Sequence, residues 1–314
     1  MTDAFSTVGI LYAGEMGAAV ASLLRRRGTP VVTTARGRGE STARRAAECG
    51  AVVVGSVEDV VRASDVVVSL VVPAAAEAVA RTFVDLAHLS PRRAVFVDAN
   101  SIGPEKALAM SRTVEAAGRA FVDASINGLA KNLSTSGTLF LSGARADHVA
   151  ALFDGAVRTR VLGEEPGRAS AMKMLLGGLS KGVCALFTEL ALLAERQGML
   201  EEMVEATTAT YGGVAALAER MLPTYARHAG RRHTEMSELE ATARAAGMNP
   251  AVIEAVCRMH ESLARAMPAG PDADASSNAN ANARTNDTNA NGHANGGGLA
   301  ASVRDLAERL KNVK

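Results

Sequence analysis

The sequence predicts an α/β protein in which an N-terminal, doubly wound parallel sheet is followed by an all-α C-terminal domain. In the first half, short β-branched runs alternate with helical patterns, which is typical of strands joined by crossover helices. Most of these runs are apolar throughout, as strands covered on both faces are. After Gly167 the character changes, and helix-forming residues dominate as far as Ala266.

Eight strands are expected in the first half, over residues 8–11, 31–34, 51–54, 66–72, 94–98, 120–125, 138–141 and 160–162. Two of the connecting helices have clear starting signals. Ser56 and Asp59 have the spacing of a capping box, which opens a helix at residue 57. Pro104 suits the first turn of a helix that runs to Ala117.

A long, largely apolar helix is expected over residues 168–197, ending at Gly198. Such a helix must be buried by other helices or by a second subunit, so the sequence also predicts a homodimer. Further helical patterns cover residues 201–218, 221–228, 235–246 and 251–266. The last helix, from Leu299 to Val313, is expected to pack back on the body, with partner binding as the alternative.

The segment between the last two helices is rich in Asn, Ala, Gly and Ser and has almost no large apolar groups. It cannot bury enough surface to offset chain entropy, so it is predicted to be disordered. The expected organisation is therefore a sheet domain over residues 1–166, a helical domain over 167–267, a disordered segment over 268–298 and a C-terminal helix over 299–314.

The composition favours a soluble protein over a nucleic-acid-binding or membrane protein. Apolar residues make up 48% of the 314 residues, enough for a sizeable core. With 3% aromatics, no Trp and a net charge of +1, the chain is not expected to bind nucleic acid or a membrane. Cys49, Cys184 and Cys257 lack metal-ligand spacing and are expected to be buried in a reducing compartment. No metal site is predicted, and the N-terminal residues lack a signal-peptide pattern, which predicts a cytoplasmic location.

The stretch ILYAGEMGAAVA follows the first expected strand and is similar to the dinucleotide-binding turn G-x-G-x-x-G. Gly14 and Gly17 occupy the second and third glycine positions, and Tyr12 occupies the first. The middle glycine lets backbone approach a phosphate, and the last lets the helix pack on the strand. This predicts a Rossmann-type cofactor site, with a plain strand–helix turn as the alternative. The other residues of the predicted turn are Ala13, Glu15 and Met16.

The end of the second strand indicates which dinucleotide is bound. An NAD site usually places a carboxylate there to hold the ribose hydroxyls, and this sequence has Thr34, Arg36 and Arg38 instead. Arginine suits a phosphate through forked hydrogen bonds, so NADP(H) is predicted, with solvated loop charges as the alternative. Ligands of such sheets lie beyond the carboxyl ends of the strands. The further cofactor-binding candidates at those ends are Leu70, Val71, Val72, Pro73 and Asn100.

Several motifs in order resemble the β-hydroxyacid dehydrogenase and 6-phosphogluconate dehydrogenase superfamily, which also contains the imine reductases. They are YAGEMG (12–17), LVVP (70–73), VDANSIGPE (97–105), VDASINGLAKNLSTSGTLFLSG (122–143) and GRASAMKMLLGG (167–178). The resemblance covers about residues 8–200. The helical segment that follows is similar to a poorly characterised branch with its own C-terminal domain.

The resemblance implies an NADP-dependent oxidoreductase that transfers a hydride between the nicotinamide and a hydroxyl or carbonyl carbon. It also implies that Lys173 is the proton donor and acceptor. Oxidising an alcohol requires a base and reducing a carbonyl requires an acid, and burial among apolar neighbours would bring the pKa of a lysine toward neutrality. A snorkelling or interface lysine is the alternative. The candidate substrate-binding residues are Ser101, Ser125, Asn127, Gly128, Gly177 and Lys181.

Three departures from the family pattern affect the predicted substrate. Gly177 stands at a position where the family commonly has Asn. The family's serine-glycine-glycine motif is changed here and contains Asn127 and Gly128. Tyr12 replaces the first glycine of the dinucleotide-binding turn. We therefore expect a small, polar, anionic substrate other than an ordinary hydroxyacid. An imine reductase and a non-catalytic NADPH-binding protein are the alternatives.

Other polar residues have less specific interpretations. Asp98 and Asp123 close strands and are expected to make backbone or capping hydrogen bonds. A cluster near the middle of the helical half is interpreted as a solvated helix junction, with substrate contact as the alternative. Its members are His228, Arg231, Arg232, His233 and Glu235.

Overall fold

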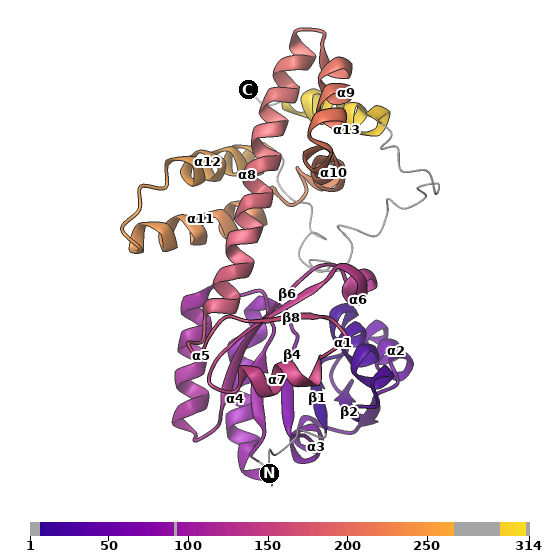
Figure 1. The fold of residues 1–314 in the computed structure, drawn as a ribbon, viewed down its shortest axis with the longest axis vertical. Coiled ribbons are helices and arrows are strands. Elements are labelled where there is room, and N and C mark those ends of the chain that lie inside the picture. Colours follow the sequence, from indigo (N-terminus) through magenta and orange to yellow (C-terminus); the bar gives the residue numbers. More distant parts are fainter. Residues whose placement is uncertain (1–6, 91–92, 267–295, 312–314) are drawn as a thin grey trace. The chain divides into compact units, whose positions relative to one another are not determined.

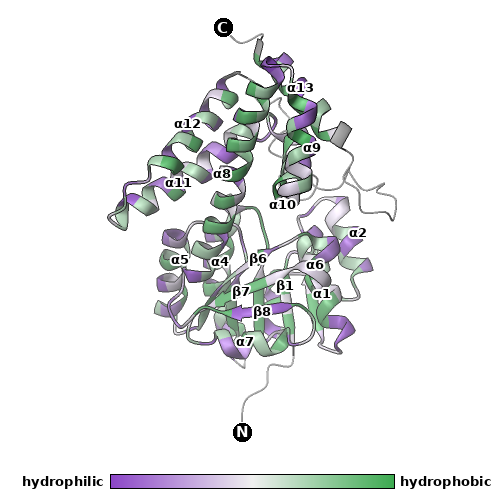
Figure 2. Ribbon diagram, turned by 45° about the horizontal axis from the view of Figure 1, so that its top comes forward, coloured by the Kyte–Doolittle hydropathy of each residue, from purple (hydrophilic) through white to green (hydrophobic). Residues whose placement is uncertain are grey.

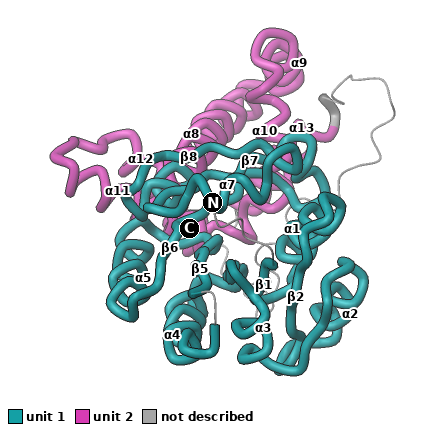
Figure 3. Tube along the Cα trace, turned by 60° about the horizontal axis from the view of Figure 1, so that its bottom comes forward, with its two compact units in different colours: residues 1–173 teal, residues 174–314 magenta. Residues whose placement is uncertain are grey.

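The computed structural model describes residues 7–90, 93–266 and 296–311. The chain divides into two compact units, Met1–Lys173 and Met174–Lys314 (Figure 3). Most of the segment predicted to be disordered, residues 268–298, lies outside the described residues.

The first unit contains an eight-stranded sheet with the order β3-β2-β1-β4-β5-β6-β7-β8 (Figure 1). All neighbouring strands are parallel except β6 and β7, which are antiparallel. The predicted mostly parallel, doubly wound sheet is therefore confirmed. The strands are β1 (Val8–Leu11), β2 (Val31–Thr34), β3 (Val52–Val54), β4 (Val66–Ser69), β5 (Val95–Asp98), β6 (Phe121–Asn127), β7 (Thr138–Ser142) and β8 (Arg158–Val161).

Helices cover both faces of this sheet, because successive strand residues point to opposite faces. In β4, Val66 and Val68 join the core under α1, α2 and α7, whereas Val67 joins the core under α3, α4 and α5. The helical elements are α1 (Glu15–Arg26), α2 (Glu40–Glu48), α3 (Val57–Ala63), η1 (Pro73–Ala75), α4 (Ala76–Leu86), η2 (Ala87–Leu89), α5 (Pro104–Ala116), η3 (Ala130–Asn132), α6 (Leu133–Ser136) and α7 (Ala146–Leu152).

Strand and helix boundaries follow local hydrogen bonds. The Ser56 hydroxyl accepts a hydrogen bond from the Asp59 N–H at 3.2 Å, which confirms the predicted cap of α3. Strand β4 ends at Ser69, before the predicted residue 72. Beyond that point the Val71 N–H donates to the Asn100 side chain instead of to a neighbouring strand, and Pro73 has no N–H to donate.

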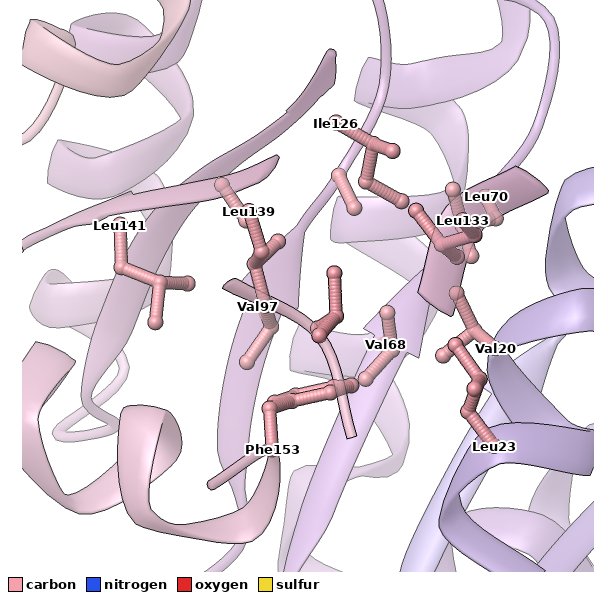
Figure 4. Close-up of a pocket in the computed structure, with 13 residues that line it drawn as sticks. Val20, Leu23, Val68, Leu70, Val97, Ile126, Leu133, Leu139, Leu141 and Phe153 are labelled. Atoms are coloured by element: carbon pink, nitrogen blue, oxygen red, sulfur yellow. The ribbon is translucent and has the colours of Figure 1, made fainter. Parts of the chain in front are cut away.

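A narrow apolar cavity of about 20 Å³ lies inside the first unit, between the sheet and its covering helices (Figure 4). All thirteen residues that line it are apolar, including Val20, Val68, Leu139 and Phe153. A cavity without polar groups does not hold water well and offers nothing to orient a polar ligand. We therefore assign it to the core and not to a binding site.

Helix α8 (Arg168–Arg196) begins in the first unit and continues into the second. Within the second unit, one side of α8 packs on α9, α10 and α13 through Cys184, Phe187 and Ala191. Ala185 joins a smaller core with α11 and α12. The remaining helical elements are α9 (Leu200–Thr210), α10 (Gly212–Met221), η4 (Leu222–Thr224), α11 (Ala229–Ala245), α12 (Ala251–Ala266) and α13 (Gly296–Lys311).

Three helix predictions in the second unit differ from the structure. The helix expected over residues 221–228 is absent, because α10 ends at Met221 and is followed by the short 3-10 helix η4 and a turn. The pattern over residues 201–218 is two helices, because Tyr211 leaves the helical region with φ −129° and ψ 50°. Helix α11 begins at Ala229, ahead of the predicted residue 235. The C-terminal helix packs back as expected, with Leu299, Val303 and Leu306 buried in the core of the second unit.

The three cysteines were expected to be buried. Cys49, Cys184 and Cys257 are all free and buried, which confirms that expectation.

Among the described residues, α8 is long and apolar enough to cross a membrane by length and composition, because an 18-residue window within it has a mean hydropathy of 1.4 (Figure 2). A core helix of a soluble protein meets the same criterion, and one side of α8 is in such a core.

Candidate active site

The carboxyl edge of the parallel strands collects the residues predicted to bind the cofactor. The strand order places β1 beside both β2 and β4, and the chain winds in opposite directions from β1 and from β4. Open α/β sheets bind ligands at such a switch point. The turn after β1, the loop after β2 and the loop after β4 all start at this edge of the first unit.

The glycine turn has the geometry that a dinucleotide phosphate requires. A side chain at Gly17 would place its Cβ 2.2 Å from the Tyr12 carbonyl oxygen, so α1 packs on the strand end at a distance that requires glycine. A Cβ at Gly14 would have no atom within 4 Å, so this turn is open. The N-cap of α1 has no side-chain hydrogen bond, which leaves first-turn N–H groups for a phosphate. These residues fit a nicotinamide dinucleotide.

The residues around that turn have different surroundings. Ala13 is buried, whereas Tyr12, Glu15 and Met16 are partly exposed. Glu15 lies in the first turn of α1, so its carboxylate is at the end of the helix that favours anions.

The loop after β2 places a guanidinium over the residue that replaces the first glycine. The Arg38 guanidinium carbon lies 3.7 Å from the centroid of the Tyr12 ring, in a cation–π contact. Thr34 is buried, and its hydroxyl accepts a hydrogen bond from the Arg36 N–H at 3.3 Å. Both arginines are exposed. The ring therefore holds one of the two predicted phosphate-binding arginines at the β1–β2 edge.

Asn100 ties the ends of β4 and β5 together. Its Oδ1 accepts from the Val71 N–H at 2.6 Å, and its Nδ2 donates to Ser69 Oγ at 3.0 Å and to Asp98 Oδ1. Asn100 is buried, so it shapes the loop that carries the cofactor candidates Leu70 to Pro73. Leu70 and Val71 are partly buried there, and Val72 and Pro73 are exposed.

Asp98 is a fully buried carboxyl group in this network. Its Oδ2 has no hydrogen-bond partner among the described residues. Burial raises the pKa of Asp98 to about 7, because no full set of donors replaces water around the carboxylate. The hydrogen bond from Asn100 and the charge of Lys173 act in the opposite direction. The interpretation of Asp98 as a hydrogen-bonding strand end is thus confirmed for one oxygen.

Lys173 reaches the same edge from the first turns of α8. Its Nζ donates to Ser101 Oγ at 2.6 Å. Lys173 is partly exposed and Ser101 is exposed. The structure therefore brings together two residues that the sequence separates by 72 positions, the predicted proton donor and a predicted substrate-binding hydroxyl.

Asp123 fixes the start of α8 on the sheet. Its Oδ2 accepts from the Ser170 N–H at 2.9 Å and from Ser142 Oγ at 3.1 Å, and its Oδ1 accepts from Ser170 Oγ at 2.6 Å. A carboxylate at the first turn of a helix satisfies free N–H groups and complements the helix dipole. The expected capping role of Asp123 is confirmed, and the cap is one turn before Lys173.

The other predicted substrate residues of the first unit lie around β6. Ser125 is fully buried and donates to the Ala169 carbonyl oxygen at 2.6 Å, so its hydroxyl holds α8. Asn127 and Gly128 are exposed at the end of the strand. A Cβ at Gly128 would lie 2.9 Å from the Gly137 Cα, so two backbone segments meet closely there.

The last two predicted substrate residues belong to the second unit. Lys181 Nζ forms an ion pair with Glu235 at 2.8 Å. A Cβ at Gly177 would lie 3.1 Å from the same Nζ, so the missing side chain leaves room for this ammonium group. No group of three metal-ligating side chains occurs among the described residues.

Sequence reasoning missed three serines in this polar network. Ser69 receives a hydrogen bond from Asn100, Ser142 bridges Asp123 and the Ala169 N–H, and Ser170 binds Asp123 twice. The signal that was present is a hydroxyl at the end of an apolar strand run, as in VVVS and TLFLS. Its partners lie far away in sequence, so the pattern alone does not identify them.

Comparison with known proteins supports the same fold. A family model described as the NAD binding domain of 6-phosphogluconate dehydrogenase matches residues 7–154. A second model, described as a domain of unknown function (DUF1932), matches residues 194–263. The chain is 34% identical to a conserved protein of unknown function whose structure was described as similar to 3-hydroxyacid dehydrogenases. That match covers 82% of this chain and 97% of the other, with a TM-score of 0.66.

Three further solved structures share the fold. A conserved hypothetical protein from Sinorhizobium meliloti 1021 is 28% identical, over 97% of this chain and 96% of its own, with a TM-score of 0.67. Mycobacterium tuberculosis 3-hydroxyisobutyrate dehydrogenase is 16% identical, over 96% and 99%, with a TM-score of 0.69. An imine reductase from Streptomyces aurantiacus is 20% identical, over 96% and 99%, with a TM-score of 0.54. The chain therefore belongs to the β-hydroxyacid dehydrogenase and 6-phosphogluconate dehydrogenase superfamily, in a branch whose C-terminal domain has no assigned function.

Proposed function

We propose that this protein is an NADP(H)-dependent oxidoreductase acting on a hydroxyl or carbonyl carbon of a small, polar, anionic molecule. The observation that carries the proposal is the 2.6 Å hydrogen bond between Lys173 Nζ and Ser101 Oγ at the carboxyl edge of the sheet. A nicotinamide dinucleotide supplies or accepts a hydride when it is bound. The remaining requirement is a group that moves a proton, and Lys173 supplies it.

In this scheme Lys173 accepts the proton of a substrate hydroxyl in oxidation and returns it to the carbonyl oxygen in reduction. The Ser101 hydroxyl accepts the hydrogen bond of the lysine and so fixes its Nζ. Asp123 fixes the helix that carries the lysine. Asn127 and Gly128 at the end of β6 complete the proposed substrate edge.

The test compares Lys173→Met and Lys173→Arg with wild type in single-turnover assays, together with NADPH binding. Both variants should lose turnover by about 10²- to 10⁴-fold, because Met carries no proton and Arg does not release one near neutral pH. Both should bind NADPH as the wild type does. Lys106→Met, on α5, is the control and should keep its activity. Full turnover in Lys173→Met would contradict the proposed role.

A panel of ketoacids, aldehydes and cyclic imines tests the substrate class. The loss of NADPH absorbance reports turnover of each compound, and parallel reactions with NADH compare the two cofactors. Turnover of cyclic imines alone would identify an imine reductase, the alternative for this scaffold. If no compound of the three classes causes NADPH oxidation, a non-catalytic NADPH-binding protein is favoured.

Selectivity for NADP(H) is proposed from the loop after β2. Arg36 and Arg38 are exposed there, and Arg38 is held on the Tyr12 ring. Arg38→Ala should weaken NADPH binding by about 10- to 100-fold, the worth of charge-assisted hydrogen bonds to a phosphate, and should leave NADH binding within about twofold. An equal loss for both cofactors would contradict this assignment.

We also propose that a second copy of the chain covers the exposed side of α8. Five leucines of this helix are between 47% and 65% exposed: Leu175, Leu179, Leu186, Leu190 and Leu193. An apolar stripe on a helix is self-complementary under two-fold symmetry. Light scattering at micromolar concentration should give a dimer, and Leu186→Glu with Leu190→Glu should give a monomer. A wild-type monomer, or recovery of the protein with lipid vesicles, would contradict the proposed dimer.

The cytoplasmic location stays a prediction from the sequence.

A further inference from the structure

A group of charged side chains lies in the second unit around the start of α11, a helix labelled in Figure 1. The charges of Lys181, Arg231 and Arg232 act on the Glu235 carboxylate, and the charge of Arg227 acts on His228. We call this group the cationic junction. Its local excess of positive charge contrasts with the net charge of +1 for the whole chain.

Arg232 is the central member because the residue is buried and its guanidinium donates one hydrogen bond within the described part of the chain. The residue is 5% exposed. Its Nη1 donates to the Tyr225 carbonyl oxygen at 2.9 Å, and its guanidinium carbon lies 4.7 Å from the Tyr225 ring centroid. A guanidinium has five N–H donors, and no other protein acceptor for them occurs in the described part of the chain. Buried charges are usually paired, and no carboxylate lies within salt-bridge distance of the Arg232 guanidinium in the described part of the chain, so a bound anion would be its first direct counterion.

Glu235 does not supply that counterion by direct contact. Its Oε2 lies 2.8 Å from Lys181 Nζ, and its Oε1 lies 3.8 Å from Arg231 Nε. These two cations, with Arg232 nearby, hold the pKa of Glu235 below its usual value against the effect of burial. The one carboxylate of the junction is therefore already shared between two other side chains.

His228 is a second polar residue of the cationic junction with little exposed surface. It is 8% exposed and is the N-cap of α11, and within the described ranges its ring makes no hydrogen bond. Burial, followed by the charges of Arg231, Arg232 and Arg227, lowers the pKa of His228 to about 4. The imidazole is therefore neutral at pH 7 and offers one N–H donor. The interpretation of this region as a solvated helix junction is wrong for His228 and Arg232, because both residues are buried.

We propose that the cationic junction is a binding site for an oxyanion, a carboxylate or a phosphate group, with Arg232 as its central ligand. Lys181, Arg231 and the His228 ring flank the position, and the N-terminus of the 17-residue helix α11 adds its dipole. Glu235 holds the cations in place before the anion arrives. The site lies wholly in the second unit and does not depend on the chemistry assigned to Lys173.

The experiment uses the full chain with labelled histidine and follows the His228 ring by NMR, assigned with His228→Gln. The probes are inorganic phosphate and, separately, acetate, each at constant ionic strength against chloride. A bound anion should shift the His228 resonances saturably and raise their titration midpoint by at least about one pH unit. Saturation by phosphate alone identifies a phosphate site, and saturation by acetate identifies a carboxylate site. Absence of saturation with both probes would overturn the proposal.

Two variants separate binding from a structural role. Glu235→Gln removes the competing carboxylate and should tighten anion binding by about tenfold, a gain that mere loss of packing does not produce. Glu261→Gln, which removes an exposed carboxylate paired with Arg265 on α12, is the matched control and should not change affinity. Arg232→Lys keeps the charge without the fork and should weaken binding. Equal or weaker affinity in Glu235→Gln, with its circular dichroism spectrum unchanged, would contradict the assignment.

Discussion

Replacing Asp98 with Asn should remove a pH dependence of stability that this buried carboxyl imposes on the first unit. Asp98 is fully buried at the end of β5, with one oxygen bonded to Asn100 and the other without a partner among the described residues. Its folded-state pKa is raised to about 7, and its ordinary value is 3.8. The Asn side chain has nearly the same shape and stays neutral at every pH.

The sign follows from proton binding. Between pH 4 and 7 the folded carboxyl holds a proton that the unfolded chain has released, so raising the pH favours unfolding. The free energy of unfolding therefore falls across this window and is unaffected by Asp98 above it. A pKa raised from 3.8 to about 7 corresponds to about 4 kcal/mol, since each tenfold change in proton affinity is worth about 1.4 kcal/mol.

The assay is urea unfolding, followed by far-ultraviolet circular dichroism at intervals from pH 4.5 to 8. Relative to wild type, Asp98→Asn should gain stability by about 1.4 kcal/mol for each pH unit within the window, and the difference should level off above pH 7. Asp147→Asn, an exposed position on α7, is the control and should follow wild type. Parallel curves for Asp98→Asn and wild type would refute the reasoning, because they would show that the carboxyl titrates alike in both states.

Three further predictions concern the glycine turn and two helix caps. Gly17→Ala should destabilise the first unit by on the order of 2 kcal/mol and abolish NADP(H) binding, because its Cβ would meet the Tyr12 carbonyl oxygen. Gly14→Ala should keep the thermal stability of the wild type and lose only cofactor affinity, because a Cβ there meets no other atom. Calorimetry measures both the stability and the affinity. Ser56→Ala should cost about 1 kcal/mol in urea unfolding through loss of the α3 cap, and an unchanged midpoint would contradict this. Asp123→Asn should slow turnover while leaving the NADPH dissociation constant unchanged, since it loosens the start of α8, and an equal effect on both would contradict a positioning role.

The sequence by itself determined the features that depend on short-range patterns. Apolar β-branched runs predicted the central strands β1, β2, β4 and β5, which are buried on both faces. The Ser56 cap and the glycine turn were predictable because they are local in the chain. The order of motifs was enough to place the chain in its superfamily. The long apolar helix was also predictable, because its length and composition do not depend on its neighbours.

Only the tertiary structure decided which polar residues meet. Lys173 and Ser101 are 72 positions apart, and their hydrogen bond exists because α8 starts against the carboxyl edge of the sheet. Asp98 and Asp123 look alike in sequence, as carboxyls in apolar strands. Among the described residues, Asp98 has an oxygen without a partner and a raised pKa, whereas Asp123 accepts two hydrogen bonds from Ser170 at the start of α8 and one from Ser142 on β7.

The same reason explains the cationic junction. The sequence shows which residues of the cationic junction are charged, but it does not indicate which of them are buried. Charged residues at a helix junction are usually solvated. Helix α11 packs against α8 and α12, Arg232 and His228 are buried, and Glu235 is paired with Lys181. Burial and pairing are properties of three-dimensional neighbours, so no local pattern could have distinguished this cluster from a solvated one.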